Sequence, residues 1–142
     1  MACLQEQSRL KRRNKKQKYL MEGSKIKIGK YGEGLASDFL IRQGARIIEK
    51  NYYTRYGEID LIAFMGDEIL FVEVKTRTGS GYGYPEQAIN YFKVKHLYKA
   101  IDKYLDRKHL NNFWRLDGIS VEVDRVQKTA KIRWFKDVGR NF

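Results

Sequence analysis

The chain has 142 residues, a 42% hydrophobic content and a formal net charge of +12, which suits one domain with a short appendage. Its single cysteine, Cys3, excludes an internal disulfide framework and a cysteine-rich zinc site. The first ten residues lack the apolar core of a secretory signal, and no apolar run approaches the roughly 20 residues that span a bilayer. We therefore expect a cytoplasmic protein with no membrane partner.

The positive charge is concentrated at the N-terminus. Ten of the 29 Lys and Arg residues lie in residues 1–30, with only two of the 17 acidic residues. A basic balance favours partners that carry phosphate, either nucleic acid or an anionic membrane surface, or it serves solubility alone; of these we expect nucleic acid. Residues 1–24 are predicted to be a basic, flexible extension, and residues 25–142 a single domain. The extension is either an idle solvated tail or an arm that binds a nucleic-acid backbone through Lys11, Arg12 and Arg13.

A first helix is predicted from about Ile28 to Gln43, because apolar residues recur at helical spacing and Gly44 is a good stop signal. Glu33 lies near its start, at the edge of the apolar face. Strands are predicted at residues 45–53, 58–64 and 69–75. The third is almost continuously apolar, as in a sheet that is covered on both faces.

A glycine-rich loop precedes a second helix, which is predicted at residues 86–107 with one apolar face. This helix also carries four lysines at short spacing, which form either a phosphate-binding stripe or a solvated face: Lys93, Lys95, Lys99 and Lys103. Two last strands are predicted at residues 113–123 and 129–135. The order α-β-β-β-α-β-β predicts an α/β fold with a mixed sheet flanked by helices.

The second and third strands are separated by Gly66-Asp67, a plausible two-residue hairpin turn. That turn would place Asp60 opposite Glu73 and Glu58 opposite Lys75. Because side chains alternate along a strand, all four would share one face. A longer turn would shift this register.

Facing carboxylates among apolar neighbours repel each other and need compensation. A divalent cation supplies it, and oxygen ligands suit Mg²⁺ or Mn²⁺ better than Zn²⁺. An ammonium two residues beyond Glu73, that of Lys75, would orient an attacking water or stabilise charge on a phosphate. The alternative is that Glu58 and Lys75 form an ordinary cross-strand ion pair. Asp60 and Glu73 would then lie at a solvent-exposed edge of the sheet.

Two segments, Gly57-Glu58-Ile59-Asp60-Leu61-Ile62-Ala63 and Phe71-Val72-Glu73-Val74-Lys75-Thr76-Arg77, resemble the YraN-like family. Its members are predicted to have the restriction-endonuclease-like PD-(D/E)XK fold and to be related to Holliday-junction resolvases. Shorter matches upstream and downstream extend the resemblance over about residues 28–123. The basic extension lies outside it.

The resemblance implies that Asp60 and Glu73 bind the metal, that the Val74 carbonyl completes the site, and that Lys75 is the catalytic lysine. Glu33 would be the supporting acidic residue on the helix. Apart from the resemblance, Arg77 lies just past this site and is either a phosphate-binding residue or a surface arginine. Lys93 and Lys95 of the helix stripe would bind nucleic acid. Since resolvase relatives act as dimers on symmetric junctions, a homodimer is plausible.

These residues favour a divalent-metal-dependent endonuclease that acts on DNA, including branched or flapped structures. The first alternative is a nucleic-acid-binding module on the same fold without catalysis, because fold members include such proteins. The second is an interaction protein whose carboxylates are structural.

Overall fold

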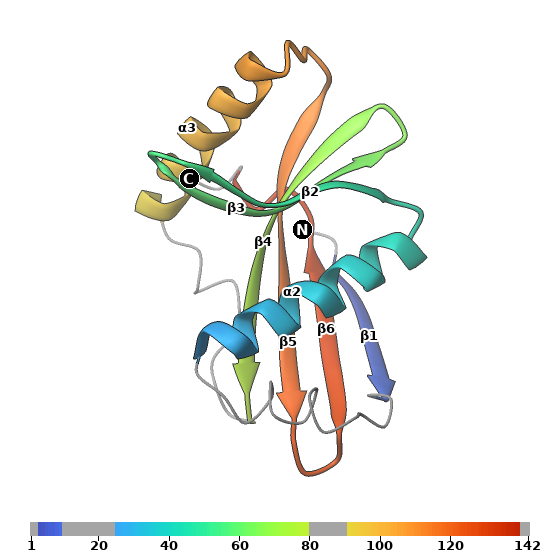
Figure 1. Cartoon of the computed structure of the whole chain (residues 1–142). Coiled ribbons are helices and arrows are strands. Elements are labelled where there is room, and N and C mark those ends of the chain that lie inside the picture. The colour runs from blue at the N-terminus through green and yellow to red at the C-terminus, as the bar shows by residue number, and fades with distance from the viewer. Residues whose placement is uncertain (1–2, 10–24, 80–90, 140–142) are drawn as a thin grey trace.

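The structure, a computed structural model, describes residues 3–9, 25–79 and 91–139. Figure 1 shows its elements, which are in chain order β1 (Cys3–Arg9), α2 (Lys25–Arg42), β2 (Arg46–Thr54), β3 (Gly57–Met65), β4 (Glu68–Thr78), α3 (Tyr91–Arg107), β5 (Trp114–Asp124) and β6 (Thr129–Phe135). The strands form one sheet in the order β1-β6-β5-β4-β3-β2. Strands β4 and β5 are parallel, and all other neighbours in this sheet are antiparallel.

The predicted mixed sheet flanked by helices is confirmed, and five predicted strands form within a few residues of their expected bounds. The first helix starts at Lys25 rather than at residue 28 and ends at Arg42. The second predicted helix is confirmed over residues 91–107, while residues 86–90 lie outside the described part of the chain.

Strand β1 was not predicted, since its residues are mostly polar. It pairs with β6 at one edge of the sheet, from Cys3 opposite Phe135 to Arg9 opposite Thr129. An edge strand has one open side and needs little apolar content, so its hydrophobic pattern is weak.

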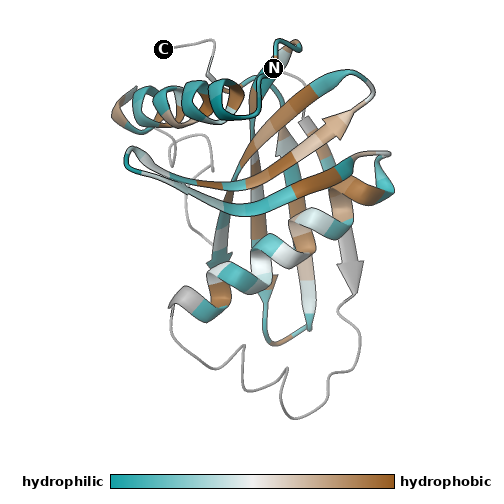
Figure 2. Ribbon diagram, turned by 45° about the horizontal axis from the view of Figure 1, so that its top comes forward, coloured by the Kyte–Doolittle hydropathy of each residue, from teal (hydrophilic) through white to brown (hydrophobic). Residues whose placement is uncertain are grey.

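Each helix covers a different face of the sheet. Helix α2 packs Ala36, Phe39 and Leu40 against one face, and α3 packs an apolar stripe that includes Leu97 and Tyr104 against the other. In Figure 2 the most hydrophobic stretches of ribbon lie along the strands, whereas hydrophilic residues recur along α3. The two cores explain why β4 reads as a continuous apolar run, because both of its faces are buried.

A glycine allows α2 to approach β4 closely. A side chain at Gly32 would collide with the Thr76 hydroxyl. The next residue on the helix is Glu33, so this close approach brings a helix-borne carboxylate down to the sheet.

Candidate metal site at the fork between strands β3 and β4

Strands β3 and β4 are joined by the predicted two-residue turn. Pairing runs from Met65 opposite Glu68 to Leu61 opposite Val72, which confirms the predicted register. Gly66 in the turn has a φ of 62°, a conformation that favours glycine. The antiparallel ladder therefore holds over the first five residue pairs of the hairpin.

The two strands separate beyond Leu61 and Val72. Strand β3 continues beside β2, where Glu58 lies opposite Tyr53, and β4 continues beside β5, where Lys75 lies opposite Ser120. We call this point the fork and define it as residues 58–60 of β3 and 73–75 of β4. The prediction that Glu58 faces Lys75 is therefore wrong, because the strands no longer pair at that level.

Asp60 lies at the base of the fork and bridges it. Its Oδ2 accepts a hydrogen bond of 2.8 Å from the backbone N–H of Val74. The side chain is almost completely buried, as is that of Glu73 on the other arm. The two carboxylates that were predicted to meet are thus neighbours, although they do not occupy a regular cross-strand pair.

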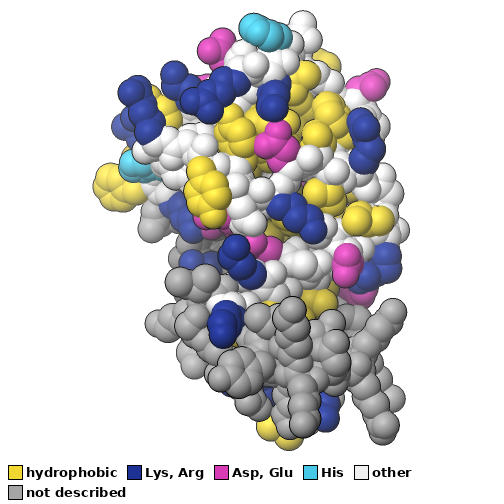
Figure 3. All heavy atoms as spheres, viewed as in Figure 1, with side chains coloured by type: hydrophobic (Ala, Val, Ile, Leu, Met, Phe, Trp, Pro, Cys, Tyr) yellow, Lys and Arg dark blue, Asp and Glu magenta, His cyan; other side chains and the backbone are white. Residues whose placement is uncertain are grey.

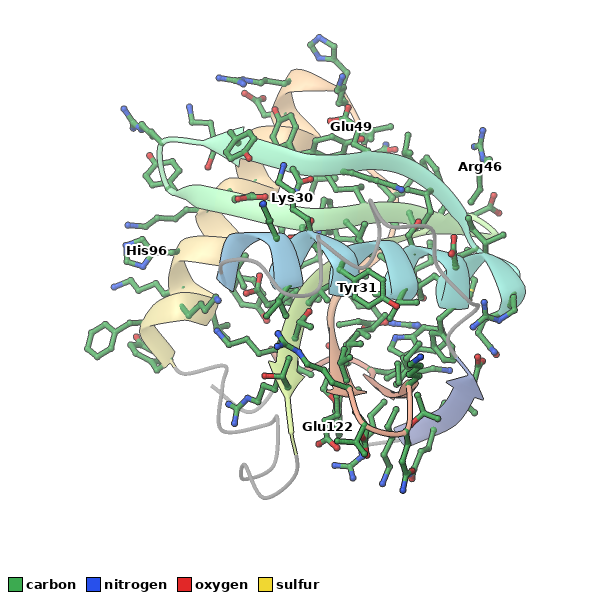
Figure 4. The ribbon with its side chains drawn as sticks, turned by 60° about the horizontal axis from the view of Figure 1, so that its bottom comes forward. Lys30, Tyr31, Arg46, Glu49, His96 and Glu122 are labelled. Atoms are coloured by element: carbon green, nitrogen blue, oxygen red, sulfur yellow. The ribbon has the colours of Figure 1, made fainter. Side chains whose placement is uncertain are left out.

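Two further carboxylates approach Asp60, that of Glu33 from α2 and that of Glu58 from β3 itself. Carboxylate oxygens of Glu33, Glu58 and Asp60 all lie within 4.8 Å of one another. Asn51 on β2 joins the first two, since its Nδ2 donates to Glu33 Oε2 at 2.8 Å and to Glu58 Oε1 at 2.5 Å. Figure 4 shows α2 in front of the sheet, with the labelled Lys30, in the turn before Glu33, on the side of the helix toward β3.

The environment of Asp60 opposes its ionisation. Burial, followed by the negative charge of Glu73, raises the pKa of the Asp60 carboxyl from 3.8 to about 8. The charge of Glu33 acts in the same direction, and the hydrogen bond from Val74 only partly offsets these effects. A bound cation would remove this opposition, because it favours the charged form of every carboxylate around it.

Glu73 has a cationic partner within the protein. The ammonium of Lys93, near the start of α3, forms an ion pair with Glu73 Oε1. Lys93 was expected to bind nucleic acid, but the structure places its ammonium at the fork. Lys75 is half-buried two residues beyond Glu73, on the same strand.

The donor set fits a hard divalent cation. Glu33, Glu58 and Asp60 each offer an oxygen atom, which is the ligand type that Mg²⁺ and Mn²⁺ prefer. Of the metal ligands that were predicted, this group contains Asp60, while Glu73 and Val74 border it. Glu58 was placed opposite Lys75 and was not among the predicted metal ligands, although its place two residues before Asp60 already put both carboxylates on one strand face.

Asn51 is the site residue that the sequence did not indicate. It has a φ of 52°, a left-handed conformation that asparagine tolerates better than most residues. The sequence did contain one sign of it, because asparagine is unusual in the middle of a strand such as residues 46–54.

The remaining predicted residues are spread over the surface. Arg77 is half-buried near the end of β4 and Lys95 is exposed on α3. Lys11, Arg12 and Arg13 lie outside the described residues. Within the described part of the chain, no helix is long and apolar enough to cross a membrane.

The mixed six-stranded sheet with one helix on each face is compatible with a restriction-endonuclease-like fold. Comparison with known proteins gives the family. The model of Uncharacterised protein family UPF0102 matches residues 32–121, and the chain belongs to this family. This confirms the family resemblance that the sequence motifs suggested.

Relatives in the same family cover most of the chain. A UPF0102 protein of Alkaliphilus oremlandii (strain OhILAs) is 42% identical over 107 residues, which are 75% of this chain and 92% of the relative. A UPF0102 protein of Clostridium tetani (strain Massachusetts / E88) is 40% identical over 111 residues, which are 78% of this chain and 91% of the relative.

Proposed function

We propose that the protein is a divalent-metal-dependent nuclease that hydrolyses phosphodiester bonds of DNA, with branched or flapped DNA as the favoured substrates. The observation that carries this proposal is the placement of Asp60, a buried carboxylate surrounded by other acidic groups at a fork in the sheet. A buried group of like charges is costly unless a cation joins it.

The roles follow from the positions of the side chains. Glu33, Glu58 and Asp60 would hold Mg²⁺ or Mn²⁺, and Glu73 borders the same point. Such an ion, when bound, polarises a phosphoryl group and lowers the pKa of a bound water. Lys75 would orient the attacking water or stabilise the negative charge that develops on the phosphate. Asn51 holds Glu33 and Glu58 in place through its amide.

A non-catalytic nucleic-acid-binding module is the second candidate, and one contact favours it. The ion pair between Lys93 and Glu73 supplies one cation from within the protein, where a metal ligand was expected. In that case the basic surfaces would bind phosphate, and the fork would be a structural cluster. A cytoplasmic location and a homodimer stay predictions under both candidates.

The experiment that separates them is a cleavage panel on plasmid, single-stranded, flapped and four-way-junction DNA with Mg²⁺ or Mn²⁺. The wild type should cleave at least one substrate, and Asp60→Ala and Lys75→Ala should not. Asp38→Asn is the matched control, because Asp38 is an exposed acid on the same helix as Glu33. Binding of DNA by the wild type without cleavage under either metal would favour the binding module.

A further inference from the structure

Helix α3 carries a row of cations on its exposed side. Lys95, Lys99, Lys103 and Arg107 follow one another at intervals of four residues, and all four are exposed. This spacing places successive residues on one side of a helix, with a rise of about 6 Å between neighbours. The row is therefore about 18 Å long, a length over which one strand of B-DNA carries about five phosphates.

The turn between β2 and β3 adds to the same surface. Arg55 donates a hydrogen bond of 2.6 Å to the hydroxyl of Tyr56, and its guanidinium lies 4.8 Å from the centre of that ring. Lys99 approaches the same ring from α3, at 5.6 Å. Tyr56 also lines a shallow pocket of about 320 Å³ together with Lys99, Asp102, Lys103 and Asp106. The turn and the helix thus form one continuous surface.

Three of the cations on this surface are not neutralised by ion pairs with described residues. Within the described residues, Arg55, Lys99 and Lys103 form no ion pair within 4.0 Å. The five cations of the row and the turn outnumber the two carboxylates of the pocket, Asp102 and Asp106. Figure 3 shows the resulting concentration of Lys and Arg over α3 and the β2–β3 turn.

Both elements lead directly to the fork. Glu58 follows Tyr56 by two residues on β3, and Lys93, which pairs with Glu73, precedes Lys95 by two residues on α3. The row of cations therefore begins near the candidate metal site and extends away from it along the helix.

We infer that Arg55, Tyr56 and the row from Lys95 to Arg107 form a binding surface for the phosphate backbone of the nucleic acid that flanks the reacting bond. This inference rests on the proposed function, since it takes nucleic acid as the substrate. It adds the direction in which the substrate leaves the site, along α3 rather than across β5 and β6. Tyr56 provides an aromatic side chain among the cations, which a sugar or an unpaired base can contact.

The test is the salt dependence of binding to a fluorescent 20-base-pair duplex, measured by anisotropy in EDTA so that no hydrolysis occurs. The double substitution Lys99→Gln, Lys103→Gln should weaken binding at least about tenfold at 0.1 M salt and lower the salt slope by about 1.8, because each phosphate contact contributes about 0.9. The matched control is Arg125→Gln, Lys128→Gln, which removes two exposed cations from the turn between β5 and β6 at the other end of the sheet. Its slope should stay within about 0.5 of the wild type.

Equal slopes for the two double variants would overturn the inference. So would an unchanged DNA affinity in the α3 variant together with lost binding to phosphatidylserine vesicles, because the surface would then serve an anionic membrane. Failure of the proposed nuclease activity would give a different result from failure of this binding surface. A wild type that binds through α3 but cleaves nothing with metal would keep this surface and remove the nuclease activity.

Discussion

Two buried aspartates, Asp60 at the fork and Asp117 on β5, have very different hydrogen-bond and charge environments. Asp117 is completely buried and accepts hydrogen bonds from Arg115 Nε at 2.9 and 3.1 Å, from Trp134 Nε1 at 2.9 Å and from the backbone of Asp137 at 2.8 Å. Asp60 accepts one backbone hydrogen bond, from Val74, and faces other carboxylates. One aspartate is compensated by donors of the protein, whereas the other lies among like charges.

Asp117 and Asp60 thus contrast a compensated buried charge with an uncompensated one. A carboxylate that is surrounded by donors and a guanidinium fixes the positions of the strands that carry them, here β5, β6 and the segment that follows β6. A buried carboxylate among like charges weakens the fold, and groups in such surroundings are frequent at functional sites. Asp117 is of the first kind, since Arg115 donates to both of its carboxylate oxygens.

The largest expected effect on stability comes from removing the compensated carboxylate, that of Asp117. Asp117→Ala should lower the free energy of unfolding by about 3 kcal/mol, because it leaves the buried Trp134 indole N–H and the part-buried Asp137 backbone N–H without their acceptor and removes one partner of an ion pair. Urea unfolding monitored by tryptophan fluorescence measures this. Glu68→Ala, which removes the other and more exposed partner of Arg115, should cost less than about 1 kcal/mol. Similar losses in both variants would contradict the assignment.

The second prediction concerns metal and the fork. Saturating Mg²⁺ or Mn²⁺, at about 100 times its dissociation constant, should stabilise the wild type by about 2.7 kcal/mol, because the ion binds the folded state alone. Thermal unfolding with and without metal measures the shift. Asp60→Asn should abolish it, and Asp38→Asn should retain it. A wild type whose melting temperature ignores both ions at millimolar concentration would show that the fork does not bind metal.

The sequence predicted the hairpin that carries this site better than the contacts between its side chains. The turn at Gly66-Asp67 set the register of the hairpin, and the alternating pattern put Glu58 and Asp60 on one face. Both signals are local, since they depend on residues that are close in the chain. They could be read without knowing where the rest of the sheet lies.

What could not be predicted depends on distant neighbours. The fork exists because β3 stays with β2 while β4 stays with β5, and no residue of the hairpin itself specifies that choice. The ion pair between Lys93 and Glu73 joins residues 20 positions apart through the packing of α3. Pairing of β1 with β6 likewise joins the two ends of the chain.

The smallest expected effect is a pH dependence that only the uncompensated aspartate should show. The pKa of Asp60 is about 8 in the folded protein against 3.8 ordinarily, because it is buried and lies beside Glu73. The folded state therefore binds the proton more tightly, and its free energy of unfolding falls as the pH rises from about 4 to 8. Asp60→Asn keeps the acceptor for Val74 and removes the titration, so its stability relative to the wild type should increase from pH 6 to pH 8.

The limit for one proton is about 1.4 kcal/mol per pH unit. Urea unfolding in EDTA at pH 6, 7 and 8 measures the difference between variant and wild type, in which the other titrating groups largely cancel. Asp38→Asn is the control again, since an exposed acid should give a difference that is the same at all three pH values. A constant difference for Asp60→Asn as well would mean that Asp60 is already ionised at pH 6. The fork would then hold its charges without a cation, and the contrast with Asp117 would disappear.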